Sequence, residues 1–187
     1  MDRSSRRTLQ LRPAPGVTKD SPAPASPLIM RRAAPDDWPA LWAIFSAVVA
    51  GGDTYTFAPD TPEADARRFM LGPGTDCFVA ERAGEIVGTY VLRPNQPGLG
   101  AHVANAGYMV RPGEFGGGIG TAMGEHSLVE ARAAGYRAMQ FNAVVSTNTR
   151  AVALWERLGF RIIGTVPEAF RHAREGYVAL HIMYRAL

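Results

Sequence analysis

The feature that most constrains the fold is a glycine-dense turn between an apolar strand and a helix. The segment NAGYMV at 105–110 has the pattern of a strand, and RPGEFGGGIG follows it at 111–120. The residues at 121–136 then have the apolar spacing of a helix. Glycines let a backbone approach a ligand without Cβ clashes, and the N–H groups and dipole of a helix start favour an anion. The turn predicts a phosphate site, although a purely structural turn explains it equally well on its own.

A second segment favours the phosphate site. The sequence NTRAVALWERLGF occupies 148–160, after another apolar strand, AMQFNAVVS, at 138–146. Together the two segments resemble the paired motifs of the Gcn5-related N-acetyltransferases (the GNAT superfamily), V-x-P-x-x-[RQ]-x-x-G-x-[GA] and N-x-x-A-x-x-L-[YW]-x-x-x-G-F. The matching positions are Val110, Pro112, Gly116, Gly118, Gly120, Asn148, Ala151, Gly159 and Phe160.

The resemblance implies a mixed α/β (α+β) fold, in which a central, mostly antiparallel sheet with a splayed strand pair is flanked by helices. It also implies acetyl-coenzyme A (acetyl-CoA) as the co-substrate. The arm of this molecule would enter the splay and pair with strand backbone, and the turn would hold its pyrophosphate. The residues expected to bind it are Met109, Val110, Phe115, Gly116, Gly117, Gly118, Ile119, Gly120, Thr121, Asn148 and Trp155.

The chain departs from the family pattern at two positions. Phe115 stands where the family usually has Arg or Gln, so a side-chain contact to phosphate is lost while the backbone amides remain. Trp155 stands where the family often has a tyrosine that protonates the leaving thiolate. An indole N–H is a donor only. Protonation of the thiolate by water is the alternative.

A narrower resemblance links the chain to the N-acetyltransferases that detoxify L-azetidine-2-carboxylate and related proline analogues. It is carried by GGDTY, GTYVLRPNQPG, HVANAGYMV, FNAVVSTN and IGTVPEAF. In that family, asparagines that match Asn105 and Asn142 lie at the substrate site, which makes these two the catalytic candidates. Because strand interiors disfavour Asn, each amide needs a partner. The alternative is a structural bond to neighbouring backbone. Asp53, Tyr55 and Glu168 are loop candidates for handling the amine.

These resemblances imply an N-acetyltransferase in which the amine of a small amino acid or analogue attacks acetyl-CoA directly in a ternary complex. Two alternatives stay open: a protein or peptide N-acetyltransferase, and a non-catalytic domain that binds acetyl-CoA. The expected partner is a small-molecule amine, and a homodimer is kept open.

Composition excludes several other classes of function. Lys19 is the only lysine, which removes a Walker phosphate loop and a pyridoxal Schiff base in the folded part. Cys77 is the only cysteine, so neither an internal disulfide nor a cysteine zinc site is expected, and the four histidines lack metal-ligand spacing. No apolar run reaches the roughly 18 residues of a membrane span. We expect a cytoplasmic protein without a metal.

Charge and proline divide the chain in two. The formal net charge of +3 arises in residues 1–29, and the charges of residues 30–187 sum to zero, so no nucleic-acid partner is expected. We expect a disordered, basic, Pro/Ser-rich tail at 1–27 and an acetyltransferase domain at 28–187, with Met30 as an alternative translation start.

The pattern of the domain predicts its elements. The expected strands are 28–33, a pair at 75–94 that turns at Ala83–Gly84, 102–110, 138–146, 161–166 and 177–184. Asp36 or Asp37 should cap a helix that ends near Val49, and Thr61 should cap a second helix with Pro62 at its first position.

Overall fold

Seven strands form one mixed sheet in the computed structural model, which describes residues 26–187. The predicted tail at 1–27 therefore lies outside the described residues except for its last two. The strand order is β1-β2-β3-β4-β5-β7-β6, and all neighbours are antiparallel except β4 and β5. The strands are β1 (Leu28–Arg32), β2 (Asp76–Arg82), β3 (Glu85–Pro94), β4 (Val103–Val110), β5 (Ala138–Val145), β6 (Arg161–His172) and β7 (Gly176–Ala186).

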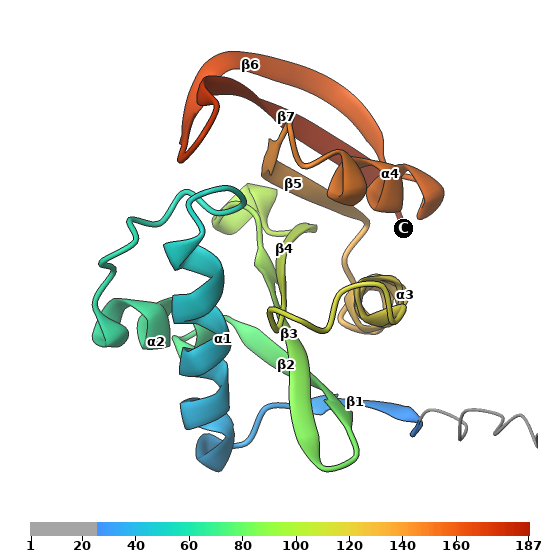
Figure 1. Cartoon of the computed structure of the whole chain (residues 1–187). Coiled ribbons are helices and arrows are strands. Elements are labelled where there is room, and N and C mark those ends of the chain that lie inside the picture. Colours follow the sequence, from blue (N-terminus) through green and yellow to red (C-terminus); the bar gives the residue numbers. More distant parts are fainter. Residues whose placement is uncertain (1–25) are drawn as a thin grey trace, which may run out of the picture.

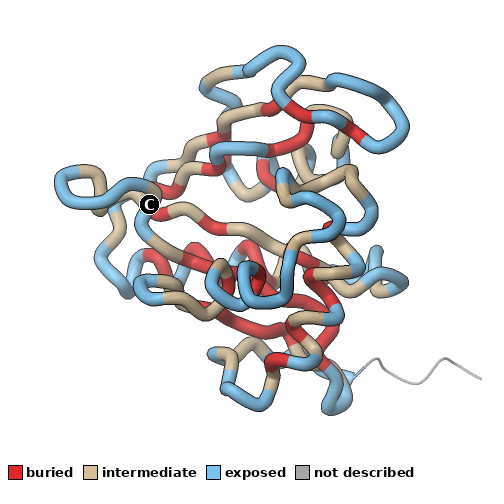
Figure 2. The backbone as a smooth tube through the Cα atoms, turned by 90° about the vertical axis from the view of Figure 1, so that its left-hand side faces the viewer, coloured by how far each residue is buried: buried red, intermediate tan, exposed pale blue. Residues whose placement is uncertain are grey.

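Helices cover both faces of the sheet. They are α1 (Trp38–Ala50), α2 (Glu63–Leu71), α3 (Ile119–Ala133) and α4 (Thr149–Arg157), with short 3-10 turns η1 (Pro35–Asp37) and η2 (Gly98–Gly100). One core cluster packs under α1 and α2 and a second under α3 and α4. Figure 1 shows the two helix pairs on opposite sides of the strands, and Figure 2 shows the buried residues gathered along the layers between them. This confirms the predicted fold class.

The two central strands separate soon after they meet. β4 and β5 are in register only at Val103 with Ala138 and at Ala104 with Met139. Beyond that point β4 stays in unbroken register with β3 as far as Gly88 with Val110. β5 instead pairs with β7 and has an irregularity between Phe141 and Val144. We call the residues over which β4 and β5 no longer pair with each other, 105–110 of β4 and 140–145 of β5, the splay. The predicted splayed strand pair is confirmed.

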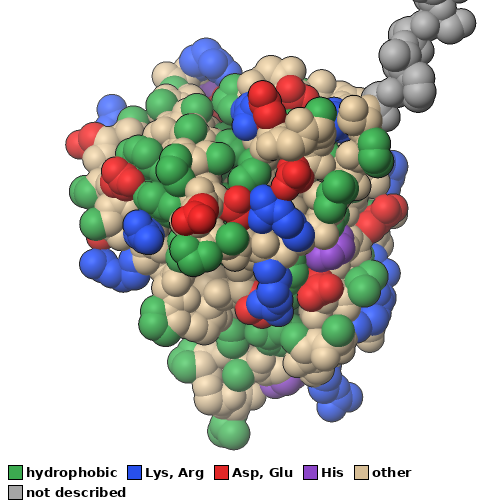
Figure 3. All heavy atoms as spheres, turned by 90° about the horizontal axis from the view of Figure 1, so that it is seen from below, with side chains coloured by type: hydrophobic (Ala, Val, Ile, Leu, Met, Phe, Trp, Pro, Cys, Tyr) green, Lys and Arg blue, Asp and Glu red, His purple; other side chains and the backbone are tan. Residues whose placement is uncertain are grey.

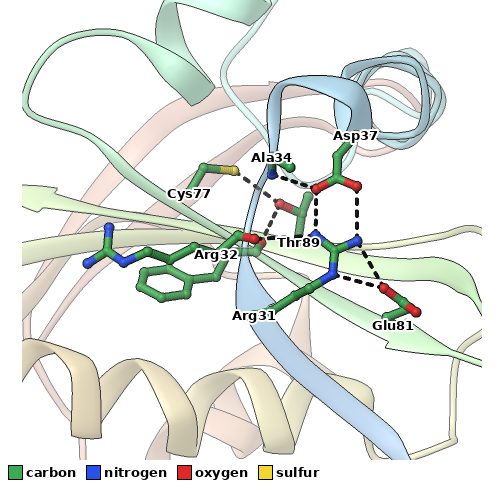
Figure 4. A network of polar contacts seen from close by, with 8 residues as sticks. Arg31, Arg32, Ala34, Asp37, Cys77, Glu81 and Thr89 are labelled. Carbon is green, nitrogen blue, oxygen red and sulfur yellow. Dashed lines mark hydrogen bonds and ion pairs between the residues drawn. The ribbon is translucent and has the colours of Figure 1, made fainter.

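Ionic contacts fasten β1 to the start of α1. The Arg31 guanidinium donates to both Asp37 oxygens, at 2.6 and 3.0 Å, and to Glu81 at 2.9 Å (Figure 4). Asp37 also accepts from the backbone N–H of Ala34 at 2.7 Å. Arg31 holds the pKa of the Asp37 carboxyl below its usual range. Asp37 precedes α1 as predicted, but its side chain turns back towards η1 and makes no cap bond to α1.

Two predicted boundaries are wrong. Pro62, and not Thr61, is the N-cap residue of α2, and the Thr61 hydroxyl donates to the carbonyl of Ala58 at 2.6 Å. The strand predicted at 161–166 continues to His172. It forms an arm with β7 whose buried Phe170 and Leu180 give it a small apolar interior.

Candidate active site

β4 directs alternate backbone groups into the splay. Arg111 donates to Val87 at 2.9 Å and Asn95 to Val103 at 2.8 Å, so the odd-numbered residues of β4 bond towards β3. In an antiparallel pair the intervening residues face away, and here these include Tyr108 and Val110. The backbone groups of Val110 therefore face the splay. The backbone of Met109 turns towards β3 and its side chain is buried, so the backbone of Tyr108, and not that of Met109, faces the splay.

The glycine turn begins α3 with free N–H groups. Gly116 and Gly118 have positive φ angles of 93° and 75°, a left-handed conformation that L side chains rarely adopt. Gly118 is the N-cap residue of α3 and no side chain caps the helix. Ile119 is buried in the core, whereas Thr121 is half-buried on the first turn. Within 26–187 the helix start therefore has its amides available for an anion.

Two arginines lie against this turn. Arg82, the last residue of β2, donates to the carbonyl of Gly117 at 3.2 Å and lies 3.6 Å from a Glu114 oxygen. Its Nε is buried and has no partner in the described part of the chain. The Arg150 guanidinium lies 5.5 Å from the centre of the Phe115 ring, which is 59% exposed. Two guanidinium groups, one from β2 and one from α4, thus lie beside the turn in which position 115 carries no charge.

The second motif forms α4, which packs across α3. The Asn148 side chain accepts from the N–H of Ala151 at 3.1 Å, so Asn148 caps the helix as the sequence suggests. Trp155 is 7% exposed, and its ring centre lies 4.6 Å from that of Tyr108. Gly120 belongs to this helix contact as well as to the turn, because a Cβ there would lie 3.2 Å from Leu154.

Asn105 sits where the pairing of β4 and β5 ends. Its Nδ2 donates to the backbone carbonyl of Gln140 at 2.9 Å. Asn105 and Gln140 each directly follow the last residues in register, Ala104 and Met139. The amide thus replaces the backbone bond that is lost as the strands diverge. This arrangement matches the structural alternative for Asn105 and also places the residue at the start of the splay.

Asn142 belongs to a cluster of amides. It lies in the irregular stretch of β5 and is exposed, so it does not need a protein partner in the way that an amide inside a regular strand does. Its Nδ2 donates to Asn95 at 2.7 Å and its Oδ1 accepts from Gln140 at 2.9 Å. Asn105 and Asn142 are therefore linked through Gln140. Asn105 bonds to the backbone carbonyl of Gln140, and Asn142 bonds to its side-chain amide.

Tyr55 reaches the splay from the loop between α1 and α2. Its hydroxyl donates to the backbone carbonyl of Tyr108 at 3.1 Å, and burial raises the pKa of this phenol well above its usual value. A Cβ on Gly107 would lie only 2.9 Å from that hydroxyl. The sequence singled out Tyr55 but not this contact. A glycine inside an apolar strand signals such a close approach.

The remaining amine-handling candidates lie on the β6–β7 arm and the loop that it touches. Ala173 donates to the carbonyl of Gly52 at 2.9 Å, and Arg174 lies 3.5 Å from Asp53. Glu168 is exposed and has a positive φ of 52° where the β6–β7 register shifts. The structure thus places Asp53 near the arm and in an ion pair, and it places Glu168 on the arm.

Three further features of the described residues concern metal sites, membrane spans and surface charge. Residues 26–187 contain no group of His, Cys, Asp and Glu side chains arranged to hold a metal ion. Within the same range, no helix has the length and apolarity to span a membrane. Figure 3 shows basic and acidic side chains interspersed on the face that it presents.

Known proteins share this architecture. A Gcn5-related N-acetyltransferase from Kribbella flavida is 46% identical, with a TM-score of 0.82 over 86% of this chain and 98% of that chain. A phosphinothricin acetyltransferase from Sinorhizobium meliloti, solved in complex with AcCoA, shares the fold at 22% identity, with a TM-score of 0.75 over 86% of this chain and 88% of that one.

Sequence comparisons agree. N-acetyltransferase aca1 of Schizosaccharomyces pombe is 36% identical over 98 residues, which are 52% of this chain and 47% of aca1. The chain thus spans about half the length of this curated relative. The profile of the acetyltransferase (GNAT) family matches residues 38–160, from the first residue of α1 to the end of the second motif. The chain therefore belongs to the acetyltransferase (GNAT) family.

Proposed function

We propose that the protein is an acetyl-CoA-dependent N-acetyltransferase that acts on the amine of a small amino acid or proline analogue. The observation that carries this proposal is the continuity of two features. On β4 the splay extends to Val110, and the uncapped start of α3 follows within ten residues. One extended ligand with an anionic end can engage both. Family membership and the AcCoA complex of a protein with the same fold support this choice.

The residues present fit that co-substrate. The amides of the turn at 116–121 would bind its pyrophosphate, and Arg82 and Arg150 would add the positive charge that Phe115 does not provide. The backbone of Val110 would pair with the amide groups of the arm as a neighbouring strand does. The bound molecule supplies an acetyl group activated as a thioester.

The protein would promote transfer mainly by holding the reactants together. Positioning of two reactants supplies up to about 7–11 kcal/mol of the barrier. The N–H of Tyr108, next to Val110 along this edge, also faces the splay and would stabilise the oxyanion as the neutral amine attacks the thioester carbonyl. Tyr55 is unsuited to be the base, because burial raises the pKa of its hydroxyl and the hydroxyl proton is donated to Tyr108. Glu168 and Asp53 remain the candidates, and water would protonate the thiolate.

Gly118→Asp tests the phosphate site. A Cβ at Gly118 meets nothing within 4 Å, so the carboxylate would project from the turn and repel a phosphate. Calorimetry should show at least tenfold weaker acetyl-CoA binding. Gly135→Asp is the control, because Gly135 has a similar φ of 83°, equally open space and a position beyond the other end of α3. Unchanged affinity in Gly118→Asp would refute the site.

The acceptor is tested by following thiol release from acetyl-CoA with amino acids, proline analogues, simple amines and peptides. Preferential turnover of amino acids or proline analogues is expected. Turnover of peptides alone would indicate a protein or peptide N-acetyltransferase. Tight acetyl-CoA binding without turnover of any acceptor would indicate a non-catalytic binding domain.

A further inference from the structure

Arg93 is a partly buried cation on the α1/α2 face of the sheet. It pairs with Asn105 across β3 and β4. Residues two apart in a strand share a face, and Val91 and Met109 both pack in the core under α1 and α2. Arg93, Asn105 and Gly107 therefore point to that same face. The Arg93 guanidinium lies over the ring of Phe69 of α2, 4.8 Å from its centre.

This cation lacks the counter-charge that several arginines of the domain have. Arg31, Arg32 and Arg111 each lie within 3.0 Å of a carboxylate oxygen. Arg93 has no carboxylate within ion-pair distance in the part of the chain that the structure describes, and stacking on a ring contributes only about 0.5–1 kcal/mol at a solvated site. Withdrawing a guanidinium from water without an ion partner is costly. The position is therefore suited to an anion from outside the protein.

Arg93 lies between a surface depression that is open to solvent and the splay. Arg93 and Asn95 line a surface depression of about 410 Å³ beside the loop at 72–75. Asn95 in turn accepts from Asn142. On the inner side, the charge of Arg93 acts on the Tyr55 hydroxyl, which bonds to the splay-facing carbonyl of Tyr108. An anion at Arg93 would thus lie between open solvent and the backbone that we expect to hold the acetyl group.

Asn105 and Asn142 are less suited than Arg93 to bind this anion. Each has one amide hydrogen already committed, in Asn105 to the Gln140 carbonyl and in Asn142 to Asn95. A neutral amide with one free N–H can assist an anion but cannot neutralise it. A guanidinium presents two parallel N–H groups that match the two oxygens of a carboxylate.

We propose that Arg93 binds the carboxylate of the acceptor and thereby selects acceptors whose amine and carboxylate lie close together. The inference rests on the proposed function and narrows its substrate class. An amino acid or cyclic imino acid bound by its carboxylate at Arg93 would extend its amine towards the splay. A peptide N-terminus has an amide in place of that carboxylate, so it would gain nothing from Arg93.

The test varies the charge on the protein and on the acceptor together. Wild type, Arg93→Gln and Arg93→Lys are assayed with L-azetidine-2-carboxylate and L-proline and with the carboxamides of both. Wild type should prefer the acids by tenfold or more in kcat/KM. Arg93→Gln should lose at least tenfold on the acids and less than threefold on the carboxamides, and Arg93→Lys should fall between. Arg67→Gln is the control, because Arg67 also lies over a ring, that of Trp38 at 5.3 Å, but outside the depression.

Calorimetry with the same acids on the complex with coenzyme A measures acceptor binding without turnover. Loss of acid binding in Arg93→Gln alone, with acetyl-CoA affinity unchanged, supports the inference. Equal losses on acids and carboxamides would overturn it, as would wild-type turnover of amines without any preference for a carboxylate. If acetyl-CoA binds but no acceptor is acetylated, the proposed function fails. Arg93-dependent binding of the acids in calorimetry would still support the anion site in that case.

Discussion

Asn105 shows how one side chain can serve the fold and the site together. Its amide bonds the Gln140 carbonyl where the backbone pairing of β4 and β5 ends, while its position faces the same side as Arg93. The strand pattern alone shows only that an Asn there needs a partner. The identity of that partner depends on where the strands separate, and this depends on contacts across the whole sheet.

The two asparagines should respond differently to truncation. Asn105→Ala leaves the Gln140 carbonyl without its bond, which costs about 1–3 kcal/mol, or roughly 2–12 °C in Tm for a domain of this size. Asn142 is exposed, so Asn142→Ala should change the free energy of unfolding by less than about 0.5 kcal/mol.

Urea unfolding of both variants, together with kcat/KM for the amino-acid acceptor, separates the two roles. We expect kcat/KM to fall in both variants, and stability to fall in Asn105→Ala alone. A stable Asn105→Ala would show that its bond contributes little to the fold. Full activity in Asn142→Ala would remove that residue from the acceptor site.

Among the elements, the loop between α1 and α2 is the one whose role was hardest to predict. Its sequence, GGDTYTF, is typical of a loop, and Tyr55 was one polar candidate among several. The hydroxyl of Tyr55 meets β4 at a residue 53 positions away. The local signals were more reliable: the strand pair around Ala83 and Gly84 is confirmed, with φ angles of 51° and 81° in the turn.

Gly107→Ala tests the contact between this loop and β4. The new Cβ would meet the Tyr55 hydroxyl at 2.9 Å, so the hydroxyl must move and the Tyr108 carbonyl loses its bond. We expect Gly107→Ala to lower the unfolding free energy by about 1–3 kcal/mol. In a Tyr55→Phe background the same substitution should cost less, because no hydroxyl then occupies that space.

A double-mutant cycle in urea measures the coupling between the two positions. Residues in contact typically show coupling energies of about 0.5–3 kcal/mol. Additive effects of Gly107→Ala and Tyr55→Phe would mean that the glycine is required for some other reason.

At the scale of the whole molecule, the motifs at 105–160 were sufficient to predict the fold class and the splay. They were not sufficient to predict the β6–β7 arm, because its interior depends on long-range packing of Phe170 and Val145. They also missed Arg93. An arginine near the end of a strand is ordinary in a sequence, and only the surrounding structure shows that carboxylates are lacking around it.

The position at which the folded domain begins can be tested by truncation. β1 starts at Leu28, which pairs with Arg82 and packs against the core, and Ile29 pairs with Glu81. A chain that begins at Leu28 should keep the Tm and activity of the full chain. A chain that begins at Met30 loses two residues of β1 and should melt several degrees lower.

Thermal unfolding of the two truncated chains decides between these expectations. Equal Tm values would show that the first two residues of β1 add nothing, which would leave Met30 compatible with the fold as a translation start. A lower Tm in both chains would show that residues before Leu28 contact the domain.

Two hydrogen bonds at the splay also determine what it excludes. A peptide strand offers N–H and carbonyl groups in alternation, so it needs both kinds of partner from an edge that it joins. Tyr55 and Asn105 already occupy one carbonyl on each side, at Tyr108 and at Gln140. An intruding strand would have to compete with the Tyr55 and Asn105 side chains for these two carbonyls. The splay is thus an open pair of strand edges that resists the aggregation to which such edges are prone.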